Sequence, residues 1–202
     1  MTNCNMLVAL AAASICLAGC SDKPASGESD PVTSESLNVG VDKSVVDSGK
    51  MAASNSIAEN IAGSPNHKML HGTLQAAGLV ERLGGDGEYT VFAPTDAAFV
   101  QIPPVTREGW MLPAQKQVLH AILNHHVVRG RIDSAELERL VDAGDGAAKL
   151  KTLDGRDLWI RRSGASYILT SGSGNKAAIT EADLAQKNGV VHIVDAVLIP
   201  AT

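Results

Sequence analysis

Cysteine is scarce in this 202-residue chain, and all three cysteines, Cys4, Cys16 and Cys20, lie within its first 20 residues. The rest of the sequence therefore has no thiol for a disulfide, a redox couple or a nucleophile. A domain without disulfides must be held together by its apolar core, and about 150 residues are enough to bury one.

Basic residues are also fewer than acidic ones. The chain has 17 Lys and Arg against 22 Asp and Glu, which gives a net charge of −5, and none of these residues stands in the first 19 positions. This mild negative balance argues against a partner that is held by its own negative charge, such as nucleic acid or an anionic lipid surface. We therefore expect no nucleic-acid partner.

The apolar stretch at the N-terminus, Met6 to Leu17, is too short for a membrane-spanning helix and is typical of a signal-peptide core. It ends in Leu17-Ala18-Gly19-Cys20, which resembles the lipobox of bacterial lipoproteins, where small residues precede the cysteine that receives the lipid. We interpret residues 1–19 as a signal peptide and Cys20 as the lipidation site, with plain secretion as the alternative. The protein is then exported to the cell envelope, on the periplasmic side or the outer surface, and the lipid anchor is its only membrane contact.

Residues 20–52 have no aromatic side chain and no sustained periodicity, and Ser, Asp, Gly, Val, Lys and Pro dominate them. Such a segment buries too little apolar surface to fold, so we interpret it as a disordered tether. Folding signals begin near Ser56, and we place a single domain at residues 53–200.

Helices are predicted from capping signals and from apolar residues that recur with the helical period. Five are expected: one after the capping box Ser56 to Glu59, one over Leu70 to Leu83, a short one capped by Thr95 and Asp96, one from Pro113 to His126, and one from Asp133.

Strands are predicted where β-prone residues alternate between turn signals. They are expected at 89–93, in a hairpin around Asp154-Gly155, a dipeptide typical of two-residue hairpin turns, and at 167–170, 177–180 and 190–199. Helices come first and strands mostly later, which indicates an α+β fold with an antiparallel sheet.

Three segments, Thr90 to Phe99, Ile122 to Val128 and Asn188 to Pro200, resemble the signatures of the fasciclin domain in order and in spacing. The resemblance covers residues 53–200 and implies a wedge of two packed β-sheets with helices along one side. It also implies adhesion or matrix attachment in secreted and surface proteins, with no fixed enzymatic chemistry. The motif residues that it singles out as structural are Thr95, Asp96, Asn188, His192 and Asp195, and His125 stands where the family usually has tyrosine.

His126 follows Ile122 by four residues and shares the apolar face of its helix. We expect it to be half-buried, with one ring nitrogen bonded to a backbone or carboxyl oxygen. The resemblance leaves a direct contact with a partner as the alternative role.

Two tryptophans are further candidates for partner binding, because tryptophan is often an anchor at protein interfaces. Trp110 is expected in a loop between helices. Trp159 is expected to face away from Leu158 and Ile160, and Arg161 lies close to it. The alternative for each tryptophan is that it covers the edge of the core.

No catalytic or metal-binding constellation is evident. His120, His125 and His126 lack the i,i+4 spacing of a zinc-binding helix. Asp195 is expected to share a strand face with Val191 and Ile193, where a buried carboxylate needs a partner or a local bulge. No serine or cysteine nucleophile stands near it in the sequence, so we expect no enzyme and no cofactor.

The sequence therefore favours a lipid-anchored binding module that engages an extracellular or envelope protein or glycan. A structural or stress-related envelope component without a dedicated ligand is the alternative.

Overall fold

The computed structural model describes residues 51–201. The predicted signal peptide, Cys20 and most of the predicted tether lie outside the described residues. Within the described range the helices are α1 (Ile57–Gly63), α2 (Lys68–Ala77), α3 (Val80–Gly84), α4 (Asp96–Val100), α5 (Pro104–Trp110), the 3-10 helix η1 (Pro113–Gln115), α6 (Lys116–His125) and α7 (Ser134–Ala143). The strands are β1 (Tyr89–Pro94), β2 (Val127–Arg129), β3 (Ala147–Lys151), β4 (Asp157–Ser163), β5 (Ser166–Thr170), β6 (Lys176–Gln186) and β7 (Gly189–Val194).

The strands form one seven-stranded sheet in the order β2-β1-β7-β6-β5-β4-β3. The α+β class is therefore confirmed, but the sheet is not wholly antiparallel. β1 and β7 are parallel neighbours, from Tyr89 opposite Gly189 to Pro94 opposite Val194. A parallel pair requires a long crossover, and here the crossover consists of all the helices and strands between β1 and β7.

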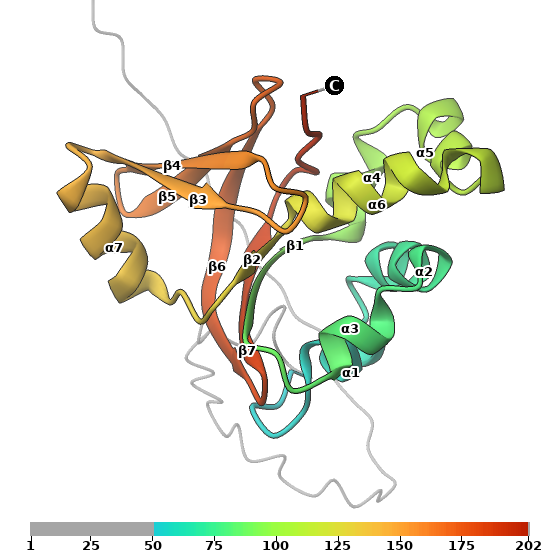
Figure 1. Ribbon diagram of the computed structural model, residues 1–202, viewed down its shortest axis with the longest axis horizontal. Coiled ribbons are helices and arrows are strands. Elements are labelled where there is room, and N and C mark those ends of the chain that lie inside the picture. Colours follow the sequence, from blue (N-terminus) through green and yellow to red (C-terminus); the bar gives the residue numbers. More distant parts are fainter. Residues whose placement is uncertain (1–50, 202) are drawn as a thin grey trace, which may run out of the picture. The chain divides into compact units, whose positions relative to one another are not determined.

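The two separate sheets implied by the resemblance are joined into one by β6. Its first residues pair with β5, and its remaining residues pair with β7 through two shifts of register. Such irregularities bend a strand and increase its twist. Figure 1 shows the result: β3, β4 and β5 run across the direction of β1 and β7.

Several helix predictions are confirmed. At α1 the backbone N–H of Ser56 donates to the Glu59 carboxylate (2.7 Å), and Glu59 N–H donates back to the Ser56 hydroxyl (3.3 Å). The single helix expected over Leu70 to Leu83 is wrong, because Gly78 adopts a left-handed φ of +73° and ends α2. Glycine adopts this conformation without a steric penalty, and its N–H caps the free carbonyls of the last turn.

The segment that becomes α5 was expected to be a loop. Only Trp110 of its seven residues is buried, so the helix has no apolar stripe that periodicity could detect. β2 was not predicted either. The hairpin around Asp154 and Gly155 is confirmed, but it closes through Thr152–Arg156 rather than through two residues.

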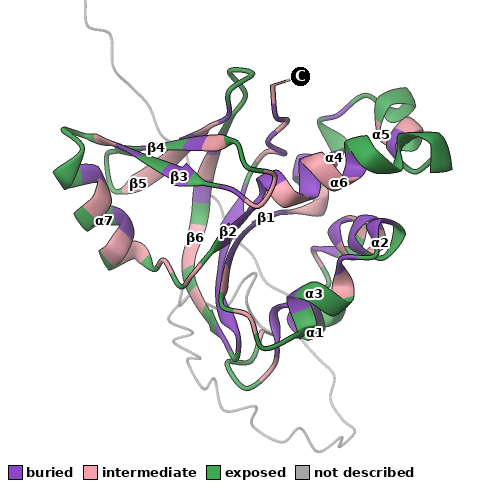
Figure 2. Ribbon diagram, viewed as in Figure 1, coloured by how far each residue is buried: buried purple, intermediate pink, exposed green. Residues whose placement is uncertain are grey.

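Apolar side chains pack into two clusters. One lies among α1–α6, β1 and β7 and includes Ile57, Leu74 and Phe99. The other packs α7 against the inner side of β3, β4 and β5 and includes Leu137, Leu158 and Leu169. In Figure 2 the buried bands alternate with exposed ones along β4. The sheet therefore has one covered and one uncovered side in this region.

Candidate functional site

Asn188, in the last signature segment, joins the turn between β6 and β7 to the helical region. Its side-chain oxygen accepts a hydrogen bond from Ile57 N–H (2.9 Å), and its amide donates to the carbonyls of Leu83 (2.7 Å) and Gly85 (2.9 Å). A Cβ on the next residue, Gly189, would lie 1.8 Å from the Tyr89 carbonyl oxygen, so only glycine fits there. This pair is structural, because it satisfies buried backbone groups and brings β7 against β1.

His126 is the C-cap residue of α6 and is only 2% exposed, so the expectation of half-burial is corrected. Its Nδ1 lies 2.8 Å from the Ile122 carbonyl oxygen, and its Nε2 accepts a hydrogen bond from Leu198 N–H (2.9 Å). These contacts require the neutral ring with the proton on Nδ1. Burial lowers the pKa of His126 to about 4. The ring therefore holds α6 to the C-terminal segment, and it does not reach the surface that a partner would contact.

His192, on β7, is fully buried and stacks on Phe92 with their ring centroids 5.5 Å apart. Its Nε2 lies 2.8 Å from the Ile132 carbonyl oxygen, and its Nδ1 accepts from Asp183 N–H (3.3 Å). Burial lowers its pKa below the ordinary histidine value. This residue too has both ring nitrogens engaged by the backbone.

Thr95 and Asp96 connect β1 to two helices. The Thr95 hydroxyl accepts from Ala98 N–H (3.3 Å) and caps α4. The Asp96 carboxylate accepts from Met69 N–H (2.8 Å) in the first turn of α2, where a negative charge is favourable.

Asp195 differs from its expected position. β7 ends at Val194, and Asp195 is exposed rather than buried with Val191 and Ile193. Its carboxylate accepts from Ala178 N–H (2.7 Å) and its own N–H donates to the Ala178 carbonyl (3.2 Å). The strand ends here because the chain turns away from β6 after this reciprocal pair.

Histidine at position 125 contacts the β3–β4 loop. The ring is fully buried, and its Nδ1 lies 3.2 Å from the Asp154 carboxylate. Burial opposes the charge on Asp154, but hydrogen bonds from Thr152, the Arg156 N–H and His125 outweigh it and lower the pKa of Asp154. Asp154 therefore turns inward from the loop Thr152–Arg156.

Trp110 is the last residue of α5, not a loop residue, and is 8% exposed. It belongs to the helical apolar cluster. Of its two possible roles, the structure therefore supports coverage of the core.

Trp159 is 41% exposed and faces away from Leu158 and Ile160, which are buried. The register places Lys149 and Thr170 directly opposite Trp159 on β3 and β5, and places Ile168 opposite Arg161. Thr170 in turn pairs with Lys176 on β6. Residues opposite one another share a face of the sheet. We call this outer side of β3–β6 the hairpin face, and it comprises Lys149, Lys151, Asp157, Trp159, Arg161, Ile168, Thr170 and Lys176.

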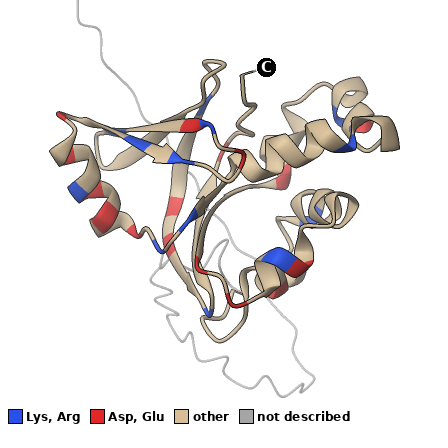
Figure 3. Ribbon diagram, in the orientation of Figure 1, with Lys and Arg blue, Asp and Glu red and all other residues tan. Residues whose placement is uncertain are grey.

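Basic side chains dominate the hairpin face. Lys149 and Lys151 share one carboxylate, that of Asp157, at 2.9 and 3.3 Å. The Lys149 ammonium also lies 5.0 Å from the centroid of the Trp159 ring, in a cation–π contact. Arg161 and Lys176 form no ion pair with any residue of the described range. Figure 3 shows basic bands on β3 and β4 with an acidic band at the start of β4, whereas α7 carries acidic bands together with a basic one.

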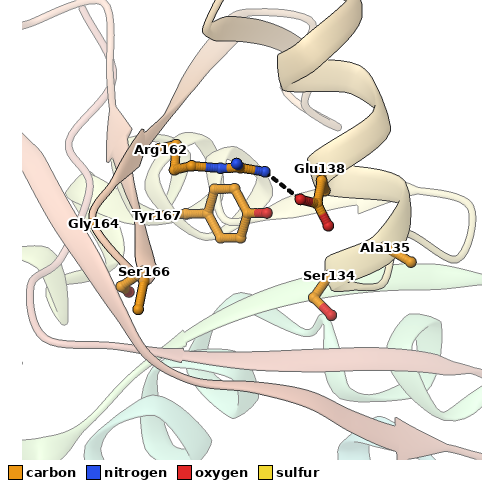
Figure 4. Close-up of a pocket in the computed structure, with 8 residues that line it drawn as sticks. Ser134, Ala135, Glu138, Arg162, Gly164, Ser166 and Tyr167 are labelled. Atoms are coloured by element: carbon orange, nitrogen blue, oxygen red, sulfur yellow. Dashed lines mark hydrogen bonds and ion pairs between the residues drawn. The ribbon is translucent and has the colours of Figure 1, made fainter.

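Arg162 points to the opposite side of the sheet. Its guanidinium pairs with Glu138 on α7 and lies 3.8 Å from Asp142. Figure 4 shows it above the Tyr167 ring and directed at Glu138. Of the two adjacent arginines, Arg162 is therefore engaged by α7, and Arg161 is available to a partner.

Two grooves adjoin Trp159. One has a volume of about 420 Å³ and is lined by Trp159, Arg161, Arg162, Ser163, Ile168, Thr170 and Lys176. The other has about 410 Å³ and is lined by His125, Lys151, Gly155, Arg156, Asp157, Trp159, Gly172 and Ala201. The indole is the one lining residue that the two grooves share.

Sequence reasoning identified Trp159 and Arg161 but missed Lys149, Lys151 and Lys176. The alternation of charged and apolar residues in β3 could have indicated the first two. Lys176 is 15 residues beyond Arg161, and only the strand register brings it to the same face.

Within residues 51–201, no three His, Cys, Asp or Glu side chains are grouped so that they could hold a metal ion. None of the helices in that range combines the length and apolar character that a transmembrane span requires.

The fold and these residues define a class of protein, an α+β domain. Buried polar side chains hydrogen-bond its distant segments together, and one uncovered side of its sheet carries basic side chains around a tryptophan. Residues 65–200 match the family model of the fasciclin domain, and the chain belongs to this family. The family is associated with cell adhesion and with cell-surface proteins, and its domains are typically non-catalytic.

Individual relatives agree with this assignment. Protein sll1483 of Synechocystis sp. is 35% identical over 144 residues, which are 71% of this chain and 73% of that protein. The cell surface glycolipoprotein MPB83 of Mycobacterium bovis is 33% identical over 60% of this chain and 48% of its own. The transforming growth factor-beta-induced protein ig-h3 of Sus scrofa is 37% identical over 71% of this chain, but the match spans only 19% of that protein.

Among solved structures, a FAS1 domain pair from the insect cell adhesion molecule fasciclin I superposes with a TM-score of 0.64. The sequence identity is 14%, and the match covers 71% of this chain and 50% of the other. This similarity concerns the fold alone.

Proposed function

We propose that this protein is a lipid-anchored envelope component whose fasciclin domain mediates adhesion to, or binding of, an extracellular or envelope protein or glycan. The hairpin face is the binding surface. The observation that carries the proposal is the 41% exposed indole of Trp159 on a regular sheet, beside Arg161, which forms no ion pair within residues 51–201.

Physical reasons favour this face over the signature segments. Tryptophan and arginine are enriched among the residues that dominate binding energy at interfaces. A side chain on a strand that is packed from behind by α7 loses little conformational freedom on binding. The signature residues His126, Asn188 and His192 are buried and use their polar atoms within the domain.

The proposed anchor is the lipid on Cys20, downstream of the signal peptide at residues 1–19. It is supported by the lipobox-like sequence and by the relative named as a cell surface glycolipoprotein. Two acyl signals give stable attachment, whereas one alone is marginal. Cys20→Ser should therefore release the protein from the membrane fraction, and a variant protein that remains in that fraction would contradict the anchor.

Adhesion can be tested in cells that lack the chain. The full-length wild-type chain should restore attachment to the surface that the native cells colonise, and Trp159→Ala together with Arg161→Gln should not. Leu112→Ala is a matched control, because Leu112 is a large apolar side chain that is 56% exposed outside the hairpin face.

Membrane fractionation and thermal unfolding should show that every variant is exported and folded. Equal attachment of cells with and without the chain would overturn the proposed function and favour a structural envelope component.

A further inference from the structure

We propose that the hairpin face binds an anionic polysaccharide, with Trp159 as the stacking platform and Arg161 and Lys176 as the principal cations. The inference rests on the proposed function, because it names the chemical class of the partner at that same face. The observations that support it are the charge of the face, the two grooves beside Trp159 and the small number of apolar side chains among the residues that line them.

The charge of the face is opposite to that of the whole chain. Besides Arg162, which lines one groove but pairs with Glu138 on α7, five basic side chains lie on the face or line its grooves: Lys149, Lys151, Arg156, Arg161 and Lys176. Asp157 is the one carboxylate among these residues, and the two lysines of β3 engage it; Asp154, in the adjoining loop, pairs with His125 and lies 3.8 Å from the Arg156 guanidinium. A local excess of cations on a protein of net charge −5 attracts an anionic ligand to this face and not to the rest of the surface.

The arrangement of the cations fits a polymer better than a single small anion. One groove has Arg161 and Lys176 on its lining, and the other has Lys151 and Arg156. Trp159 lies between them. A chain laid across the indole would therefore meet basic side chains on both sides of the ring, as the acidic groups of successive sugar units require.

The lining favours sugar over polypeptide. Apart from Trp159, the apolar side chains that line the grooves are Ile168 in one and Ala201 in the other. Neither groove offers an apolar pocket for the anchor side chains of a peptide. The flat C–H face of a pyranose ring can stack on an indole, while Ser163 and Thr170 can hydrogen-bond its hydroxyls.

Nucleic acid suits the face less well. Binding of a single strand uses several aromatic platforms for successive bases, and the hairpin face has one.

The full-length chain, held in detergent, can be titrated calorimetrically with polygalacturonate oligosaccharides as the probe. We expect saturable binding that weakens as NaCl is raised from about 0.05 to about 0.5 M, because exposed charge pairs are screened. Dextran, which is a neutral polysaccharide, should not bind.

Variants separate the contributions of stacking and charge. Trp159→Ala, and separately Arg161→Gln with Lys176→Gln, should each weaken binding by roughly tenfold or more. Arg129→Gln removes an exposed cation from β2 at the other edge of the sheet, and it should change the affinity less than about twofold. Circular dichroism and thermal unfolding identify any variant that has failed to fold.

Several outcomes would overturn the inference. Among them are absence of polygalacturonate binding, binding that is unchanged in Trp159→Ala, and equal loss in Arg129→Gln. Tighter binding of poly-glutamate or of single-stranded DNA would assign the face to a different polymer. If polygalacturonate does not bind but attachment of cells still requires Trp159, the inference fails while the proposed function stands.

Discussion

The signature segments and the hairpin face use polar residues in opposite ways. In the signature segments, Asn188, His126 and His192 are buried and their side chains bond to backbone groups of distant segments. On the hairpin face, Arg161 and Lys176 are exposed and form no ion pair within residues 51–201. The most recognisable part of the sequence therefore maintains the fold, while the part that offers binding chemistry lies outside the signatures.

The difference has a physical origin. A buried polar group needs a partner of fixed geometry, and few residue types can replace it. An exposed side chain on a strand needs only to be compatible with water. Its residue type can therefore be selected for contact with a ligand without loss of the fold. Mutations in the signature segments should accordingly lower the stability of the fold, whereas mutations on the hairpin face should weaken binding and leave stability nearly unchanged.

Asn188→Ala should show the largest loss of stability. It leaves the Ile57 N–H and the Leu83 and Gly85 carbonyls without their partner, and we expect a loss of about 4 kcal/mol. Chemical denaturation followed by far-UV circular dichroism measures it. Asn175→Ala, at an exposed turn, is the control and should change the free energy of unfolding by less than about 0.5 kcal/mol. Comparable losses in both variants would refute the structural role of Asn188.

Acid should weaken the signature region before it titrates most carboxylates. The pKa of His126 is lowered from 6.5 to about 4 in the folded state, so between these pH values the unfolded chain binds a proton that the folded chain excludes. Stability is therefore complete above about pH 6.5 and declines as the pH falls toward 4, by about 3 kcal/mol for this residue. His192, whose pKa is also lowered, acts in the same direction.

Denaturation at a series of pH values tests this expectation. His126→Leu should be less stable than wild type at pH 7, because Leu198 N–H loses its acceptor, and its stability should depend less on pH between 6.5 and 4. A wild-type curve that is flat across that interval would contradict the assignment of a neutral buried ring.

Thr95→Ala should cost about 1 kcal/mol, since it removes the N-cap of α4. Thr106→Ala supplies the comparison: Thr106 is an exposed residue within α5, where alanine has the higher helix propensity. Thermal unfolding should show a lower midpoint for the first variant and an unchanged or higher midpoint for the second. A lower midpoint for Thr106→Ala than for Thr95→Ala would contradict the role of Thr95 as a stabilising N-cap.

Trp159→Ala and Arg161→Gln should have the smallest effect on stability, within about 0.5–1 kcal/mol, because neither side chain contributes to the core. Their effect should appear in binding instead. Unfolding of either variant at a much lower denaturant concentration would mean that the hairpin face is structural, and the contrast between the two regions would be lost.

Prediction from sequence succeeded where the determinants are local. The capping box at Ser56, the cap at Thr95, the hairpin at Asp154–Gly155 and the outward direction of Trp159 depend on residues a few positions apart. It failed where tertiary contacts decide. Gly78 divides a pattern that appears continuous, α5 has no apolar stripe, and the position of Asp195 depends on where β6 stops pairing with β7.

Only part of the candidate site could be predicted from the sequence, because local pattern places some of its residues and tertiary contacts place the others. Trp159 and Arg161 are neighbours on one strand, and alternation alone places them on one side. Their association with Lys149 and Lys176 depends on pairing with β3, β5 and β6. Nor could the sequence indicate that α7 engages Arg162 while Arg161 is left without an ion pair in the described part of the chain.

The sequence by itself determined the family, the α+β class, the absence of cysteine after position 20 and most of the local starts and ends of the elements, because each follows from composition or short-range pattern. Only the tertiary structure decided that β1 and β7 run parallel, that His126 is fully buried, and that five cations gather around one indole. These features arise from contacts between residues far apart in the chain, and such contacts are set by the packing of the whole domain.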